Sequence, residues 1–170
     1  MTAVTRIALA GLACAASCAL AGALAAPASA QTVTHKDISV DAAVIIATTA
    51  MADCKAKGWP VSVAVVGRSG ELILHMRGDG TGPHTMDNSF RKAYTARTTR
   101  QPSGELAKRL KADPQLSLIM LPNVVAAQGA LPIKIGDDVV GAAGASGAPG
   151  GEKDEVCIQT GLDKVKDQLK

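Results

Sequence analysis

The middle of the chain contains side chains that can bind a metal-containing cofactor. His84 lies in a glycine-rich segment, residues 78–85, just before a predicted helix, so its imidazole can present a nitrogen to a metal ion or to haem iron. Met86 follows closely, and a tyrosine such as Tyr94 can also ligate haem iron. Haem binding with His84 as the iron ligand is one interpretation of this segment. A solvated loop histidine is the other.

Positive charge accumulates just after this segment, between residues 91 and 111, where a single acid, Glu105, stands among the Lys and Arg residues. A carboxylated ligand, for example haem through its propionates, would find partners there, because Lys and Arg form charge-assisted bonds with carboxylates. Two solvated helix faces are the alternative. Lys92 could pair with an acid of the last helix or with the ligand.

Glycine recurs at every third position from 141 to 150, in the stretch GAAGASGAPG. A dinucleotide-binding loop needs G-x-G-x-x-G and a βαβ unit downstream, and a phosphate-binding P-loop needs G-K-[ST]; neither is present. Acidic residues 152, 154 and 155 would also repel a phosphate from the start of the next helix. The spacing therefore predicts a central strand that other backbone approaches closely.

The hydrophobic pattern predicts one α+β domain over residues 31–170, built from helices at 41–57, 86–100, 102–113 and 152–169. Ser39 or Asp41 is expected to cap the first helix, and Ser103 the third. Tight turns join most of the intervening strands, so we expect a five-stranded antiparallel sheet with helices packed against it. The expected strands are 61–67, 71–77, 123–130, 131–137 and 138–147.

Composition excludes several classes of function. The formal net charge is only +3, and 2% of the residues are aromatic, which argues against nucleic-acid binding. The sequence has no H-E-x-x-H, no G-x-S-x-G and no Cys/His spacing typical of zinc sites, so an enzyme acting on a hydroxy acid or a tetrapyrrole has the least support.

The first thirty residues are typical of a secretory signal peptide, residues 1–30, with small residues before Gln31. The mature protein is then expected in the periplasm or outside the cell, with no membrane insertion after cleavage. A lipoprotein is an alternative, since Cys14 and Cys18 lie in the apolar run. Cys54 and Cys157 would remain, either as a disulfide or as two separate buried thiols.

Three segments carry a resemblance to a known family. They are GWPVSVAVVGRSGELIL at 58–74, KAYTA at 92–96, and the block from Leu131 to Leu162 that contains the glycines. Together they are similar to the GlcG/HbpS family, also called DUF336 or the haem-degrading domain. The resemblance implies a profilin-like or PAS-like (GlcG-like) fold and a tendency to form homo-oligomers. It also implies haem or tetrapyrrole binding in some members, without assigning an iron ligand.

We therefore expect an exported haem-binding protein, non-catalytic or weakly haem-degrading, with its pocket between residues 78–95 and 144–151. The candidate cofactor-binding residues are His84, Met86, Lys92, Tyr94 and Thr95. Thr95 is a candidate for the same reason as Lys92, because both belong to the KAYTA motif. The alternative is an oligomeric periplasmic protein that binds a small carboxylate or serves a membrane sensor.

Overall fold

The structure is a computed structural model that describes residues 32–170, so the predicted signal peptide lies outside the described residues. Residues 35–170 make up one unit. Its elements in chain order are α1 (Val40–Ala56), β1 (Ser62–Val66), β2 (Leu72–Met76), α2 (His84–Thr99), α3 (Ser103–Ala112), η1 (Ser117–Met120), β3 (Ala130–Ile135), β4 (Asp138–Ser146), α4 (Gly151–Val165) and η2 (Lys166–Gln168). Within 32–170, no helix is long and apolar enough to cross a membrane.

Local sequence signals explain where the first elements begin and end. The Ser39 hydroxyl caps α1 by accepting a hydrogen bond from the backbone N–H of Ala42 at 3.2 Å, and Gly58 follows the helix with a φ of 77°. The turn between β1 and β2 contains Gly70 at a φ of 83°, which other residues rarely adopt. These features match the predicted cap, stop and hairpin.

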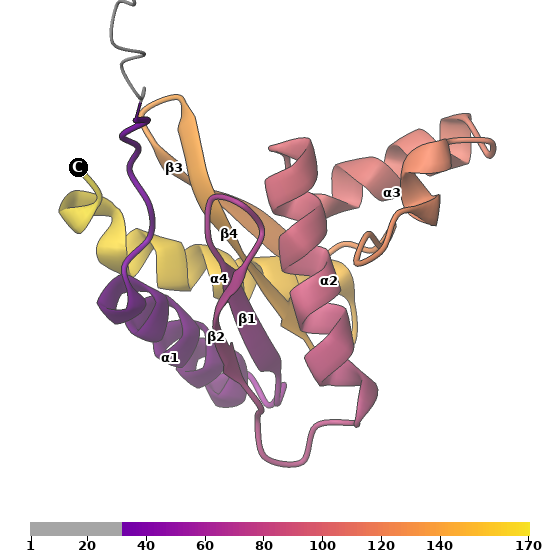
Figure 1. Ribbon diagram of the computed structural model, residues 1–170. Coiled ribbons are helices and arrows are strands. Elements are labelled where there is room, and N and C mark those ends of the chain that lie inside the picture. The colour runs from indigo at the N-terminus through magenta and orange to yellow at the C-terminus, as the bar shows by residue number, and fades with distance from the viewer. Residues whose placement is uncertain (1–31) are drawn as a thin grey trace, which may run out of the picture. The chain divides into compact units, whose positions relative to one another are not determined.

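All strand pairs in the sheet are antiparallel, in the order β2-β1-β4-β3. The two central strands are buried along almost their whole length, whereas β2 at one edge is partly exposed. Helices α1 and α4 pack on one face of the sheet and α2 packs on the other (Figure 1). The predicted α+β class with an antiparallel sheet is therefore confirmed.

The prediction of a fifth strand over residues 123–130 is wrong, because the sheet has four strands. Asn123 has a φ of 64°. The backbone of Val125, two residues later, forms hydrogen bonds with helix α2 instead of with a strand. The Thr95 hydroxyl accepts from the N–H of Val125 at 2.9 Å and donates to its carbonyl at 3.2 Å. Since α2 side chains satisfy these backbone groups, the segment has no need of a strand partner.

The expected cap of the third helix is also corrected. Ser103 is the first residue of α3, and no side chain caps this helix. Its hydroxyl instead accepts a hydrogen bond from the backbone N–H of Ala130 at 3.0 Å. Ser103 therefore connects α3 to the start of β3, a long-range contact that helix-capping statistics do not report.

The triplet-spaced glycines of β4 serve close packing, as the sequence suggested. A Cβ at Gly144 would lie 2.6 Å from the carbonyl oxygen of Ser89 and 2.8 Å from the backbone nitrogen of Ala93, both in α2. A Cβ at Gly141 would lie 2.5 Å from the carbonyl oxygen of Val66 in β1. These contacts are with backbone atoms, which cannot rotate away.

We expect Gly144→Ala to lower the free energy of unfolding by about 1–3 kcal/mol, because the added methyl group would push α2 off the sheet. Chemical denaturation monitored by circular dichroism measures this loss. Gly104→Ala is the matched control: the new Cβ would meet only the side chain of Gln128, at 3.0 Å, and Ala favours the helix. Equal losses in the two variants would contradict the packing role.

Candidate functional site

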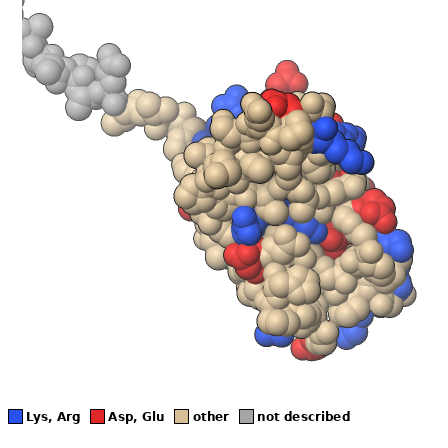
Figure 2. Space-filling view, turned by 90° about the vertical axis from the view of Figure 1, so that its right-hand side faces the viewer, with Lys and Arg blue, Asp and Glu red and all other residues tan. Residues whose placement is uncertain are grey.

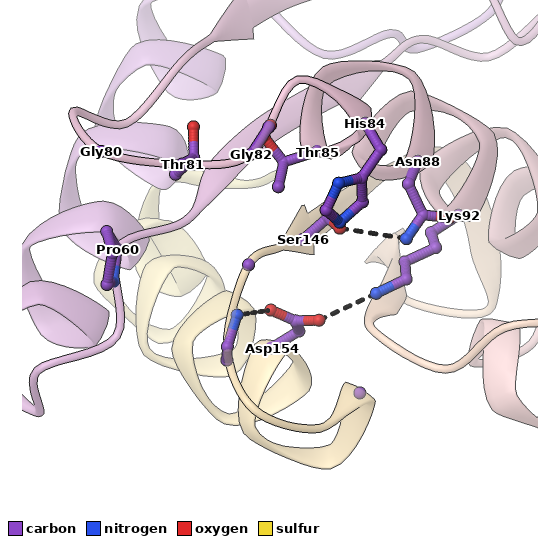
Figure 3. Close-up of a pocket in the computed structure, with 13 residues that line it drawn as sticks. Pro60, Gly80, Thr81, Gly82, His84, Thr85, Asn88, Lys92, Ser146 and Asp154 are labelled. Atoms are coloured by element: carbon purple, nitrogen blue, oxygen red, sulfur yellow. Dashed lines mark hydrogen bonds and ion pairs between the residues drawn. The ribbon is translucent and has the colours of Figure 1, made fainter.

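A cavity of about 290 Å³ lies where two helices begin, between the start of α2 and the start of α4. The glycine-rich loop before α2 forms one wall, and the end of β4 with the loop after it forms another. The side chains lining it are mostly polar. They include His84, Thr85, Asn88 and Lys92 from α2, Ser146 from β4, and Asp154 from α4 (Figure 3).

Helix geometry explains the α2 side of this cavity. His84, Asn88 and Lys92 are spaced four residues apart, so they share one face of the helix. The Asn88 side-chain amide donates to the Ser146 hydroxyl at 3.0 Å. The His84 side chain points toward this pair from the first residue of the helix, and His84 remains exposed (Figure 3).

A buried ion pair closes the inner end of the cavity. The Lys92 ammonium donates to Asp154 Oδ2 at 2.8 Å and to the carbonyl of Ala145 at 3.1 Å. The other Asp154 oxygen accepts from the N–H of Ala148 at 3.1 Å. Lys92 and Asp154 are 4% and 2% exposed. Burial raises the pKa of the Asp154 carboxyl, and the neighbouring Lys92 charge opposes this shift.

The backbone around this ion pair leaves no room for larger residues. Gly129 has a φ of 134°, and a Cβ there would lie 2.6 Å from the Lys92 ammonium nitrogen. The pair therefore fixes α2, the end of β4 and the start of α4 relative to one another. Of the two alternatives for Lys92, pairing with an acid of the last helix is the one that the structure shows.

Hydroxyl groups hold the glycine-rich loop against the sheet. The Ser62 hydroxyl, on β1, lies 2.8 Å from the Thr85 hydroxyl and 3.2 Å from the Thr81 hydroxyl. Thr81 and Thr85 also donate to the carbonyls of Gly78 and Gly82, each at 2.8 Å. This loop is therefore ordered by its own side chains, which fixes the cavity wall in the absence of regular secondary structure.

The five predicted cofactor-binding residues divide into two groups. His84 and Lys92 line the cavity, whereas Met86, Tyr94 and Thr95 are not among the described residues that line it. Tyr94 packs beside Gly70 and Phe90, with the two ring centres 6.0 Å apart, and Thr95 binds the backbone of Val125.

Sequence reasoning did not select Asn88, Ser146 or Asp154 as site residues. For Asn88 a signal existed, because it lies midway between His84 and Lys92 at helical spacing. Ser146 lies in the predicted pocket segment 144–151, and Asp154 is one of the acids of the last helix that could pair with Lys92. Only the pairing of β4 with the sheet and the packing of α4 bring these two side chains to the cavity.

A second histidine, His75 on β2, faces α2. Its Nε2 lies 3.1 Å from the Ser89 hydroxyl. Partial burial lowers the pKa of His75 because the charged imidazolium is less well solvated there. His75 is therefore favoured in its neutral form and contributes to the contact between β2 and α2.

Three of the seven positive charges between 91 and 111 are paired with acids. Arg91 lies 3.7 Å from Asp87, Lys92 is buried against Asp154, and Lys108 pairs with Glu105 at 2.7 Å. On the face that carries α2 and α3, Lys and Arg side chains are interspersed with Asp and Glu (Figure 2). For Lys108 the alternative of a solvated helix face is therefore the better description.

The fold and the cavity together define a class: an α+β domain with an antiparallel sheet between helices and a small polar cavity where two of them begin. The family model described as haem degrading protein HbpS-like matches residues 38–163. The chain therefore belongs to the HbpS-like family, which confirms the resemblance found in the sequence.

Individual relatives agree with this assignment. The crystal structure of HbpS is 33% identical, with a TM-score of 0.76, over 79% of this chain and 94% of that one. An uncharacterized 15.0 kDa protein from the dhaT–dhaS intergenic region of Citrobacter freundii is 34% identical over 107 residues, which are 61% of this chain and 75% of that protein. The PduOC:heme complex is 20% identical, with a TM-score of 0.68, over 74% of this chain and 93% of that one, and shows likeness of fold.

Proposed function

We propose that the protein is an exported haem- or tetrapyrrole-binding protein of the HbpS type, non-catalytic or only weakly haem-degrading. Membership of a family described as haem degrading supports the ligand class. The observation that carries the site is the exposed His84 imidazole at the mouth of the α2–α4 cavity, where it is free to bind iron.

The residues of the cavity suit the iron of haem better than its macrocycle. His84 would hold the haem iron through its imidazole, but a cavity of about 290 Å³ with a mostly polar lining is small for a whole macrocycle, since ligand pockets of drug-sized molecules run from about 300 to 1,000 Å³. His84 would therefore be the residue that holds haem when it binds. When bound, haem supplies redox and ligand-binding chemistry at its iron. The chain's own residues bind and orient it.

Export is the second part of this proposal. Residues 1–30 have the pattern of a secretory signal, and the mature protein would then reside in the periplasm or outside the cell. The disulfide between Cys54 and Cys157 supports an oxidising compartment, because such bonds are rare where thiols are kept reduced.

Haemin titration of the purified protein tests the ligand. We expect a shifted Soret band that saturates with protein, and His84→Ala should weaken haemin binding at least about tenfold, because it removes the proposed iron ligand. His35→Ala is the matched control, since His35 is an exposed histidine outside the cavity. An unchanged free-haemin spectrum at micromolar protein would reject haem binding, and equal affinity of the His84 variant would reject the site.

A small carboxylate bound inside the cavity is the second candidate function. Two observations favour it: the volume of about 290 Å³ suits a small molecule, and α2 begins at the cavity without a side-chain cap, whereas the acids in the first turn of α4 oppose an anion at that helix. Helix starts attract anions through their free N–H groups and the helix dipole. Binding of acetate, glycolate or lactate seen by calorimetry, with no Soret shift from haemin, would favour this function over the first.

A further inference from the structure

A second cavity, of about 360 Å³, lies between the end of α1 and the segment that follows β2. The residues that line it come from the last two turns of α1, from the chain just before β1 and from the three positions after β2. Pro60 is the one residue that lines both this cavity and the α2–α4 cavity. The two cavities are therefore neighbours, but their other lining residues can be changed independently.

Apolar side chains form one part of this lining. They belong to Met51 and Ala52 of α1 and to Pro60 and Val61, which precede β1. Val61 is only 2% exposed, so it lies at the floor of the cavity, and Met51 packs partly buried against the main core. A methionine side chain adapts its shape to the groups that it contacts. The cavity thus offers an apolar surface on which a small hydrocarbon group could be buried.

Charged side chains of both signs line the same cavity. They are Lys55, at the end of α1, and Arg77 and Asp79, which follow β2. All three residues are exposed, so their charged groups lie toward the solvent side of the apolar floor. Within residues 32–170, none of the three forms an ion pair with another residue. The cations and the acid therefore remain available to a ligand that carries both a carboxylate and an ammonium group.

The backbone after β2 brings two of these charges close to the apolar floor. Gly78 is buried, and a Cβ there would lie 2.3 Å from the carbonyl oxygen of Val61, so only glycine permits this approach. Arg77 and Asp79 flank this glycine. The Arg77 guanidinium donates one hydrogen bond, from Nη2 to the carbonyl of Thr81 at 3.0 Å. This bond orients the guanidinium and leaves other N–H groups of its planar fork free for a carboxylate.

Contacts with α4 hold the walls of the cavity in place. The disulfide between Cys54 and Cys157 ties the end of α1 to α4. The Lys153 ammonium of α4 lies 5.1 Å from the centre of the Trp59 ring, a cation–π contact that fixes the chain next to Pro60. A site whose walls are held before the ligand arrives loses less conformational entropy on binding. The cavity is thus preformed, as small-molecule sites usually are.

We propose that this second cavity binds a free α-amino acid with an apolar side chain, of the size of leucine. The ligand side chain would lie on the apolar floor, its carboxylate would bind Arg77 and Lys55, and its ammonium group would bind Asp79. A zwitterion fits better than a simple acid, which would meet the like charge of Asp79. It also fits better than a simple amine, which would meet two cations.

Isothermal titration calorimetry of the purified protein with L-leucine tests the ligand class. We expect saturable binding at one site per chain. Two matched probes each lack one charged group: 4-methylpentanoate has no ammonium group, and 3-methylbutylamine has no carboxylate. Each should bind at least about tenfold more weakly than L-leucine, because one charged hydrogen-bonding partner is lost. Glycine, which has no side chain to bury, should also bind more weakly.

Two surface variants test the residues that hold the ligand. Asp79→Asn should weaken L-leucine binding at least about tenfold without weakening 4-methylpentanoate, whereas Arg77→Gln should weaken both. Asp137→Asn and Lys57→Gln are the matched controls, since both residues are exposed and neither lines the cavity. Circular dichroism verifies that each variant folds. No heat from millimolar L-leucine, equal affinity for L-leucine and 4-methylpentanoate, or wild-type affinity in folded Asp79→Asn would overturn the proposed site.

The amino-acid site and the haem site are tested separately. Haemin titration reports on the α2–α4 cavity, and none of the variants above changes a residue that lines it. L-leucine binding without a Soret shift would leave the second site standing while haem binding fails, and the reverse result would reject the second site alone.

Discussion

Reduction of the Cys54–Cys157 disulfide is expected to lower the free energy of unfolding by about 4–5 kcal/mol, which is a large part of the stability of a domain of this size. The bond joins α1 to α4, with the two Cα atoms 5.5 Å apart and the cysteines separated by 103 positions in the sequence. Closing so long a loop removes much of the conformational entropy of the unfolded chain. Guanidinium denaturation with and without a reductant measures the loss.

The double variant Cys54→Ala with Cys157→Ala separates the bond from other effects of the reductant. It should show nearly the same loss as reduction and should no longer respond to the reductant. Both cysteines are fully buried, so small apolar replacements retain part of their packing. A denaturation midpoint that reduction leaves unchanged would show that the bond contributes nothing to stability.

Replacement of Lys92 by alanine is expected to lower the free energy of unfolding by about 3–5 kcal/mol, because it leaves the Asp154 carboxylate buried without its countercharge. Lys92 also donates a hydrogen bond to the carbonyl of Ala145, and Asp154 accepts one from the N–H of Ala148. Denaturation curves of the variant and the wild type, compared at pH 7, give the difference directly.

A variant that lacks both charges shows whether this loss comes from the pair. Removing both charges, with Lys92→Met and Asp154→Leu together, should destabilise the protein less than Lys92→Ala alone, since no unpaired charge remains buried. Lys108→Ala is the contrast, because Lys108 pairs with Glu105 at the surface and its loss should cost under about 1 kcal/mol. Equal losses at Lys92 and Lys108 would contradict the buried-pair explanation.

Periodicity predicted the elements whose contacts are mainly local. The cap at Ser39, the turn at Gly70, the hairpin between β3 and β4 and the four longer helices follow from residues close in sequence. The glycines of β4 were also informative, because only a residue without a Cβ permits the approach of α2. Signals of this kind are carried by neighbours along the chain.

The segment 123–130 shows the limit of predictions from local sequence, because its predicted strand is absent from the sheet. Two valines favour a strand, but Thr95 on α2 supplies the hydrogen bonds that a neighbouring strand would have supplied. A strand exists only if another strand is available to pair with it. The sequence does not report which partner lies beside a segment once the helices have packed.

The sequence by itself determined the α+β class, most of the element boundaries, the HbpS-like family and the choice of His84 and Lys92 as candidates. Tertiary structure alone decided that Cys54 and Cys157 form a disulfide, that Lys92 binds Asp154, and that Asn88 and Ser146 meet at the cavity. The physical reason is distance along the chain: local propensity and periodicity act over one or two turns, whereas these contacts join residues 58 to 103 positions apart.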